Sequence, residues 1–438
     1  MNERLLTGVR ALALIDGEHY ADVVVDAFRE LPYDVVGAVA LGGTEKLKGD
    51  EDYGVPLYRS LDEGISEAGA ALVLDLSDEP IVTARDRFRL ASRALAAGLP
   101  YVGADFRFDP VPFEPFELPA IAVIGSGKRV GKTAVAGHVA RMLAETREVV
   151  VVAMGRGGPP EPVVVEEPPD VQDLLSRARS GSHAASDYLE DAALAHVTTI
   201  GCRRCGGGLA GNPFVTNVAA GARAAAERRP DLVIFEGSGA ALPPVAVDAR
   251  VLVTGGAQDP GLVAGYLGAY RILVSEIVVL TGCEEPLVSA DQVERLRAAI
   301  AGVSPGIPVI ATVFRQTPAE PVDGRRVALF STAPPEIHDR LRRHLEDEHG
   351  AEVVLLSGNL SRREELRTEL ETEEARSADV YLVEIKAAAI EVVAEAASER
   401  GIAVVFAENT VLSLDGEADL DEALRRLADA AAPEGAAA

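Results

Sequence analysis

The fold of the central part of the chain is indicated by the stretch Ile121-Ala-Val-Ile-Gly-Ser-Gly-Lys-Arg-Val-Gly-Lys-Thr133. An apolar run leads into a glycine-rich turn, and Gly-Lys-Thr then opens a helical pattern over residues 134–145. Backbone N–H groups of such a turn wrap phosphate oxygens, and the helix N-terminus adds partial positive charge. The lysine reaches the terminal phosphates, and the threonine hydroxyl is placed to bind Mg²⁺. The stretch therefore predicts an ATP-binding loop formed by Ser126, Gly127, Lys128, Arg129, Val130, Gly131, Lys132 and Thr133.

This loop departs from the usual G-x-x-x-x-G-K-[ST] pattern at its first position, which is Ser126. Gly125 stands one residue too early, so the loop is one residue longer than the common form. An ordinary glycine-rich turn does not explain why Lys128 and Lys132 stand so close together. Only five of the 42 basic residues of the chain are lysines.

Length and composition limit the possible classes of protein. A chain of 438 residues is expected to form two or three domains. Its net charge of -27 argues against binding to nucleic acid or to anionic membranes. The sequence has no apolar run of about 18 residues and no signal-peptide pattern at its N-terminus, so we expect a cytoplasmic protein. Its three cysteines do not make a disulfide framework.

The N-terminal part alternates between strand-like and helical patterns. Apolar runs occur at 9–15, 35–41, 71–76 and 101–102, with helical patterns at 20–30 and 81–97. This alternation predicts an open α/β domain with parallel strands over residues 1–109. A proline-rich segment at 110–119 follows and is expected to be a stiff, extended linker.

The remainder of the chain predicts two further α/β units. The second unit, 120–323, contains the glycine-rich loop and later strands at 149–153, 232–235, 250–254, 277–280 and 309–313. The third unit, 324–429, has strands at 327–331, 353–356, 380–385 and 403–406, a charge-rich helix within 362–376, and a tail from 430 that we expect to be disordered. The expected fold is therefore α/β, a P-loop NTPase domain with a mainly parallel sheet, flanked by N- and C-terminal open α/β (Rossmann-like) units.

An acidic residue marks the end of one predicted strand. The run Leu232-Val-Ile-Phe-Glu236 is followed directly by Gly-Ser-Gly. A carboxylate at such a strand end helps to hold Mg²⁺ in P-loop enzymes. A glutamate at an ordinary turn is the alternative, which the adjoining glycines make weaker. Thr133 and Glu236 are therefore the predicted magnesium residues.

Two arginine-containing segments predict an anion site at the same sheet edge. In Cys202-Arg-Arg-Cys205-Gly-Gly-Gly208, a single C-x-x-C is weak support for zinc, and the cysteines also suit small buried hydrophobes. Two guanidiniums and a run of exposed amides instead suit phosphate or carboxylate. A second glycine turn carries an arginine after the strand at 149–153. The predicted substrate-binding residues are Arg156, Gly157, Gly158, Arg203, Arg204, Gly206, Gly207 and Gly208.

Local charge favours a polyanionic ligand despite the acidity of the whole chain. Charges are screened beyond about 10 Å at 0.1 M salt, so nearby cations decide binding. The loops described above bring six cationic side chains to one sheet edge, which suits ATP together with a strongly anionic second substrate. The turns at 16–19 and 42–46 and the basic residue Lys386 are ambiguous, since ordinary turn chemistry explains them equally well.

Several of these segments together resemble a known family. The long loop at 125–133 and the Glu236-Gly-Ser-Gly turn resemble those of dethiobiotin synthetase-like ATPases. More narrowly, the chain resembles the cyclic 2,3-diphosphoglycerate synthetases, through segments that span nearly its whole length. These segments are 42–46, 154–160, 201–208, 259–262 and 384–389.

The resemblance implies a reaction in which ATP phosphorylates one phosphate of 2,3-diphosphoglycerate and the neighbouring phosphate closes an anhydride ring. It implies Mg²⁺ as cofactor and catalytic roles for Lys128, Lys132, Arg203 and Arg204. A large cytoplasmic enzyme of this fold is also expected to form a homodimer. Two alternatives stay open. One is another dethiobiotin synthetase-like ligase acting on a carboxylate or amine, and the other is a nucleotide-switched regulatory ATPase.

Overall fold

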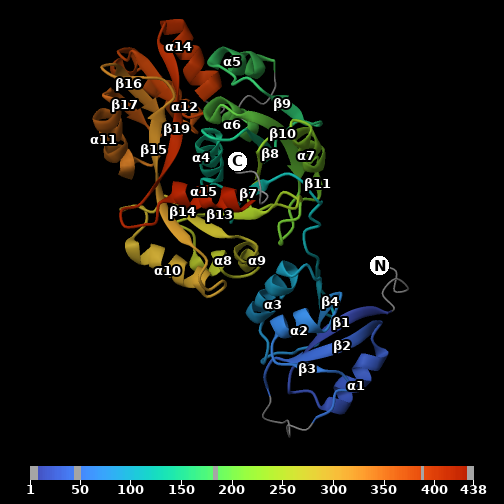
Figure 1. The fold of residues 1–438 in the computed structure, drawn as a ribbon. Coiled ribbons are helices and arrows are strands. Elements are labelled where there is room, and N and C mark those ends of the chain that lie inside the picture. The colour runs from blue at the N-terminus through green and yellow to red at the C-terminus, as the bar shows by residue number, and fades with distance from the viewer. Residues whose placement is uncertain (1–7, 44–50, 181–185, 386–388, 432–438) are drawn as a thin grey trace.

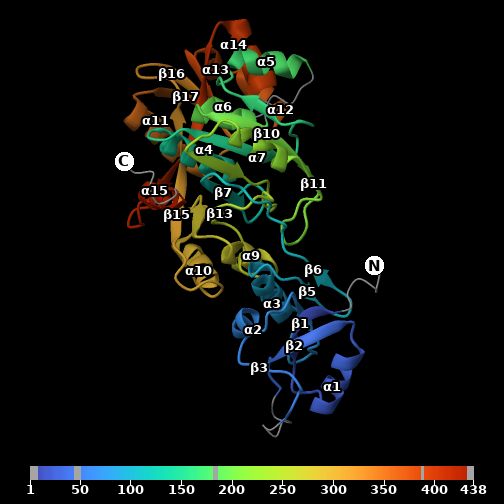
Figure 2. The same cartoon turned by 45° about the vertical axis from the view of Figure 1, so that its right-hand side comes forward.

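The computed structural model describes residues 8–43, 51–180, 186–385 and 389–431. Figure 1 shows an elongated molecule in which the N-terminal unit lies at one end of a larger body, and Figure 2 shows the same separation after rotation. None of the helices among the described residues is long and apolar enough to cross a bilayer.

The N-terminal unit contains a sheet with strand order β3-β2-β1-β4-β5-β6. The neighbouring strands of the described sheet pair in parallel, except that β6 runs antiparallel to β5. The expectation of parallel strands is therefore wrong only at this edge. The strands are β1 (Val9–Ile15), β2 (Tyr33–Ala40), β3 (Leu57–Tyr58), β4 (Leu72–Asp75), β5 (Tyr101–Val102) and β6 (Arg107–Phe108), and the helices are α1 (Ala21–Glu30), α2 (Leu61–Glu67) and α3 (Ala84–Ala96).

The proline-rich segment, predicted to be a stiff, extended linker, makes contacts with the second unit. Its residue Glu114 exchanges backbone hydrogen bonds with the second unit, donating to Pro244 O at 3.0 Å and accepting from Ala246 N at 2.8 Å. The rings of Phe116 and Phe235 meet edge to face, with centroids 5.2 Å apart. The segment therefore packs as part of the second unit, because its phenylalanines find an apolar surface there.

The second unit is built on a long, mainly parallel sheet. The order β11-β10-β8-β12-β7-β13-β14-β15 places the strand of the glycine-rich loop, β7, in its middle. The strands are β7 (Ala120–Gly125), β8 (Val149–Gly155), β9 (Val163–Val165), β10 (Thr198–Cys205), β11 (Val215–Thr216), β12 (Leu232–Glu236), β13 (Ala249–Gly255), β14 (Ile277–Thr281) and β15 (Val309–Pro318). The helices are α4 (Lys132–Ala144), α5 (Val171–Arg179), α6 (Asp187–Ala195), α7 (Val218–Ala226), α8 (Pro260–Val263), α9 (Gly268–Leu273) and α10 (Ala290–Ala301).

The third unit extends this same sheet. β15 pairs antiparallel with β19, from Thr312 opposite Ser413 to Pro318 opposite Ala407, and the order continues β19-β18-β16-β17. The strands are β16 (Arg326–Phe330), β17 (Glu352–Ser357), β18 (Val380–Val383) and β19 (Ala403–Ser413). The helices are α11 (His338–His349), α12 (Arg363–Leu370), α13 (Glu373–Arg376), α14 (Ala394–Arg400) and α15 (Leu420–Ala431), with a 3₁₀ turn at Pro335–Ile337 and a π-helix at Ala389–Val393.

The last helix returns to the second unit. Figure 1 shows α15 beside α4 and β7, and its buried residues Leu420, Leu424 and Ala428 join the core under the glycine-rich loop's helix. His138 Nε2 of α4 lies 2.7 Å from Asp421 Oδ1. The prediction of disorder from residue 430 is wrong for Ala430 and Ala431, which belong to α15. The rest of the predicted tail, 432–438, lies outside the described residues.

Candidate active site

The glycine-rich loop joins β7 to α4 as the sequence predicts, but the helix begins at Lys132, two residues earlier than its apolar pattern indicates. Gly131 makes this possible, because it takes the left-handed conformation at φ 77° as the N-cap. A Cβ at this position would lie 2.3 Å from Cζ of Phe314, so a glycine is required.

Neighbouring turns hold the loop in place. The unusual Ser126 hydroxyl donates to Gln258 Oε1 at 2.5 Å, and Thr281 Oγ1 donates to Val130 O at 2.8 Å. Gln258 lies in the turn that follows β13, and Thr281 is the last residue of β14. These two hydrogen bonds hold the longer loop against the segments after β7 in the sheet order, while Lys128 and Arg129 remain exposed.

A buried charge cluster lies beneath the loop. Lys132 Nζ donates to Glu236 Oε1, and these side chains are 8% and 0% exposed. Among the described residues, Glu236 Oε2 has no hydrogen-bond partner. Asp191 of α6 lies beside this pair and is 2% exposed; its Oδ2 also lacks a partner within the described chain. Burial, and next the Glu236 carboxylate, raise the pKa of Asp191 well above its ordinary value.

The Glu236 carboxylate, buried at the end of its strand beside the glycine-rich loop, suits a hard divalent cation. Thr133 is a half-buried residue in the first turn of α4, and Glu236 ends the adjacent strand. The residues present therefore fit the predicted magnesium site. Sequence reasoning missed Asp191. Its only signal was the pair of acidic residues, Glu190 and Asp191, inside the otherwise apolar pattern of 188–195.

The predicted anion residues are brought together only in part. A cavity of about 480 Å³ is lined by Arg156, Arg204, Cys205, Gly206, Gly207, Gly208, Ala240 and Ala241. Arg204 donates to Gly206 O at 2.7 Å and to Ser238 O at 2.8 Å. Burial, and next the charge of Arg156, lower the pKa of Arg204. Two guanidiniums therefore face the same cavity.

Gly239 connects this cationic cavity to the ATP loop. A Cβ on Gly239 would lie 2.9 Å from Arg156 Nη2 and 3.5 Å from Arg204 Nη2. On the other side, the carbonyl oxygen of Gly239 lies 2.7 Å from the position of a Cβ on Gly125. The turn after Glu236 thus separates the loop from the cavity by a single layer of backbone.

The Cys-Arg-Arg-Cys segment differs from its predicted form. It belongs to β10, whose residues alternate between the two faces of the sheet, so Arg203 and Arg204 point in opposite directions. The cavity lining includes Arg204 but not Arg203. Cys202 is buried in the core, where burial raises its thiol pKa to about 12, and Cys205 is exposed. Of these two cysteines, only Cys202 therefore packs as a small buried hydrophobe, as the sequence allows.

Gly157 and Gly158 follow Arg156 without lining the cavity. Gly158 instead lies against β10, where a Cβ would stand only 1.9 Å from Cys202 O. Its absence of a side chain allows the turn after β8 to approach the strand that carries Arg204.

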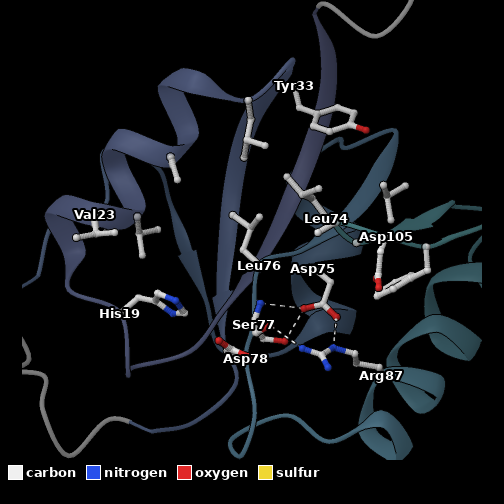
Figure 3. Close-up of a pocket in the computed structure, with 17 residues that line it drawn as sticks. His19, Val23, Tyr33, Leu74, Asp75, Leu76, Ser77, Asp78, Arg87 and Asp105 are labelled. Atoms are coloured by element: carbon white, nitrogen blue, oxygen red, sulfur yellow. Dashed lines mark hydrogen bonds and ion pairs between the residues drawn. The ribbon is translucent and has the colours of Figure 1, made fainter. Parts of the chain in front are cut away.

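The N-terminal unit has a separate cavity of about 740 Å³, shown in Figure 3, which His19, Asp75 and Arg87 help to line. Asp75 is already satisfied, since it accepts from Ser77, Arg87 Nε and Tyr101 OH. The turn at 16–19 is likewise explained by its own hydrogen bonds, because Asp16 accepts from Glu18 N and Asp78 N. Residues 44–46 of the second ambiguous turn, and Lys386, lie outside the described residues.

The central loop, its helix and the acidic strand end define a P-loop enzyme. Comparison with known families agrees. The description "Cyclic 2,3-diphosphoglycerate synthetase, P-loop domain" matches residues 120–313, and the N-terminal and C-terminal domains of that family match residues 10–109 and 318–410. The chain belongs to the cyclic 2,3-diphosphoglycerate synthetase family and is an ATP-dependent ligase.

Relatives named cyclic 2,3-diphosphoglycerate synthetase align over nearly the whole chain. The protein of Rubrobacter xylanophilus is 52% identical and covers 97% of this chain and 98% of its own. The protein of Thermococcus kodakarensis is 45% identical, and the alignment covers 93% of this chain and 95% of that protein. A solved structure of the hydrogenase maturation factor HypB from Archaeoglobus fulgidus aligns with 52% of this chain and 86% of its own at 12% identity; its TM-score of 0.29 supports no conclusion.

Proposed function

We propose that this chain forms the intramolecular phosphoanhydride of cyclic 2,3-diphosphoglycerate from 2,3-diphosphoglycerate, converting ATP to ADP and phosphate. The observation that supports this most is the position of Gly239, between the ATP loop and a cavity with two guanidiniums. A phosphoryl donor and a polyanionic acceptor would then meet across this turn. Relatives in the same family are named cyclic 2,3-diphosphoglycerate synthetase, which also supports the proposal.

The proposed reaction has two steps. First, an oxygen of one substrate phosphate attacks the γ-phosphorus of ATP, and the bond to ADP breaks. Then an oxygen of the second substrate phosphate attacks the phosphorus of the first, forming the ring P–O–P bond and expelling inorganic phosphate. Both steps bring anions together, so the protein's contribution is positioning and charge neutralisation rather than a nucleophile.

Named side chains carry these tasks in the proposal. Lys132 moves from Glu236 to the transferred phosphoryl group, and Lys128 on the same loop assists it. Thr133 and the released Glu236 would hold Mg²⁺, which neutralises charge on the phosphates when bound. Arg156 and Arg204, with the amides of residues 206–208, hold the acceptor phosphates. Arg203 is on the other face of β10, so we propose that it contributes less than Arg204 to binding the acceptor phosphates.

Alanine substitution of the two neighbouring arginines tests the acceptor site. We expect Arg204→Ala to lower kcat/KM for 2,3-diphosphoglycerate by about 100-fold, because a charge-assisted contact contributes about 1.5–3 kcal/mol. Arg203→Ala should lower it far less, and the Kd for ATP should be nearly unchanged in both variants. Unchanged turnover in the double variant would remove the arginine assignment. Activity on carboxylate or amine acceptors would instead favour another ligase.

We also propose that the chain forms three domains, 1–109, 120–323 and 324–429, with the proline-rich linker 110–119 after the first. The enzyme works in the cytoplasm as a homodimer without nucleic-acid or membrane partners. The net charge of -27 supports the last point, since it opposes nonspecific binding to nucleic acid and to anionic membranes. Sedimentation at several protein concentrations tests the dimer.

A further inference from the structure

Arg271 is a buried cation that the proposed mechanism does not use. It lies on α9 and is 5% exposed. Its Nε and Nη2 donate to Ala240 O at 2.9 and 2.6 Å, Nη2 also donates to Leu209 O at 3.2 Å, and Nη1 donates to Leu267 O at 2.9 Å. No ion pair found among the described residues involves this guanidinium. Burial lowers the pKa of Arg271 to about 10, so it remains charged at neutral pH.

Two of these carbonyl groups, those of Leu209 and Ala240, belong to the segments that form the two walls of the cationic cavity. Leu209 is part of the glycine loop, residues 206–211, and Ala240 is part of the magnesium turn, residues 236–241. The same cavity is lined by Gly206 to Gly208 from one wall and by Ala240 and Ala241 from the other. The walls also meet directly where Leu242 N donates to Gly211 O at 2.9 Å.

The contact between these walls leaves no room for a larger residue. Gly211 has φ 90°, and a Cβ there would lie 3.2 Å from Arg271 Nη2 and 2.1 Å from Leu242 Cδ1. The backbone of the glycine loop therefore rests on the guanidinium itself. A fixed planar fork can reach carbonyls on two loops at once, which the single ammonium of lysine cannot reproduce.

We infer that Arg271 is a positioning residue, which holds the glycine loop against the magnesium turn and thereby sets the shape of the cavity that receives the anionic acceptor. Its positive charge, directly behind Ala240, also adds to the field of Arg156 and Arg204. The helix that carries Arg271 follows Tyr266, whose ring packs on Phe88 of α3 with centroids 5.4 Å apart. The cavity wall is thus anchored where the N-terminal unit meets the larger body.

The test compares Arg271→Met and Arg271→Lys in the full chain. Arg250→Met is the control, since Arg250 is partly buried but stacks on Phe113, 4.5 Å from the ring centroid, at the end of β13 away from the ATP loop. The first readout is amide hydrogen exchange without substrate. The second is KM for 2,3-diphosphoglycerate and for ATP; this arm alone rests on the proposed function.

We expect Arg271→Met to speed amide exchange in residues 206–211 and 236–241 together, while the P-loop helix keeps its protection. KM for 2,3-diphosphoglycerate should rise about tenfold, as for one lost charge-assisted hydrogen bond, with KM for ATP within about twofold. Arg271→Lys should loosen the same loops but raise this KM less, because it keeps the charge. Arg250→Met should change neither loop.

Wild-type protection of both loops in the two Arg271 variants would overturn the inference. Equal rises in KM for ATP and for the acceptor would also overturn it, because they would indicate a general structural role. If the wild-type enzyme fails to act on 2,3-diphosphoglycerate, the proposed function falls, and the exchange data alone decide the role of Arg271.

Discussion

Gly158 gives the sharpest prediction about how the acceptor site is built. In Gly158→Ala, the new Cβ would lie 1.9 Å from Cys202 O, 2.5 Å from Cys202 C and 3.0 Å from Arg203 Cα. Comfortable contact begins near 3.4 Å, so the turn and β10 must separate by about 1.5 Å. These partners are backbone atoms and cannot rotate away. Overpacking of this kind costs about 1–3 kcal/mol in stability.

The catalytic effect should exceed the effect on stability. The turn carries Arg156 and the strand carries Arg204, so the separation moves the two cavity guanidiniums apart. A displacement of about 1 Å costs on the order of 100-fold in rate. We therefore expect kcat/KM for 2,3-diphosphoglycerate to fall about 100-fold while the Kd for ATP is nearly kept. ADP release in a coupled assay at saturating ATP measures the first, and calorimetric titration measures the second.

Gly155, three residues earlier at the end of β8, supplies the matched control. A Cβ on Gly155 would meet its nearest atom, Gly158 N, at 3.6 Å, which is ordinary contact. Gly155→Ala should therefore stay within about 0.5 kcal/mol, or about twofold, of the wild type. Equal activity of the two alanine variants would refute the argument from close approach.

Two further predictions concern the buried charge cluster. Burial raises the pKa of Asp191, so its stabilising contribution is complete below the ordinary carboxyl pKa of about 3.9 and is lost as pH rises toward the folded value. The free energy of unfolding of Asp191→Asn minus that of the wild type should therefore increase from pH 5 to pH 8, by about 1.4 kcal/mol per pH unit while the difference in protonation persists. Thermal unfolding at both pH values checks this, and an equal difference in Tm at the two would contradict it. Lys132→Met leaves the Glu236 carboxylate buried without its cation, so it should lower the free energy of unfolding by about 3–5 kcal/mol and abolish ATP binding. Adding Glu236→Gln should restore the free energy of unfolding but not ATP binding. Thermal unfolding of the single and double variants checks this, and a double variant no more stable than Lys132→Met would exclude the pairing argument.

The central fold was predictable because its signals are local. Apolar runs such as 120–125 and 232–236 are long, buried strands, and their carboxyl ends meet at one edge of a parallel sheet. The ATP loop follows from glycine and lysine spacing alone. The two-residue strands β3 and β6 escaped prediction because two residues carry no periodicity, whereas β5, equally short, was predicted from its apolar pair.

The remaining site depends on contacts between segments far apart in the chain. The alternation of β10 separates Arg203 from Arg204, and no motif indicates that Cys202 to Cys205 form a strand rather than a loop. Asp191 and Arg271 belong to helices with no sequence signature, and their importance arises only from burial beside Glu236 and Ala240. The joining of two sheets through β15 and β19 is likewise a long-range pairing that local patterns do not specify.

Phosphorus NMR of the purified protein with Mg-ATP and 2,3-diphosphoglycerate would show whether the protein forms the cyclic phosphoanhydride. The proposed reaction predicts new cyclic-anhydride resonances that grow together with those of ADP and inorganic phosphate. ADP and phosphate without the cyclic product would contradict the claim and point to a different acceptor. No change in any resonance would contradict it as well and favour a nucleotide-switched regulator.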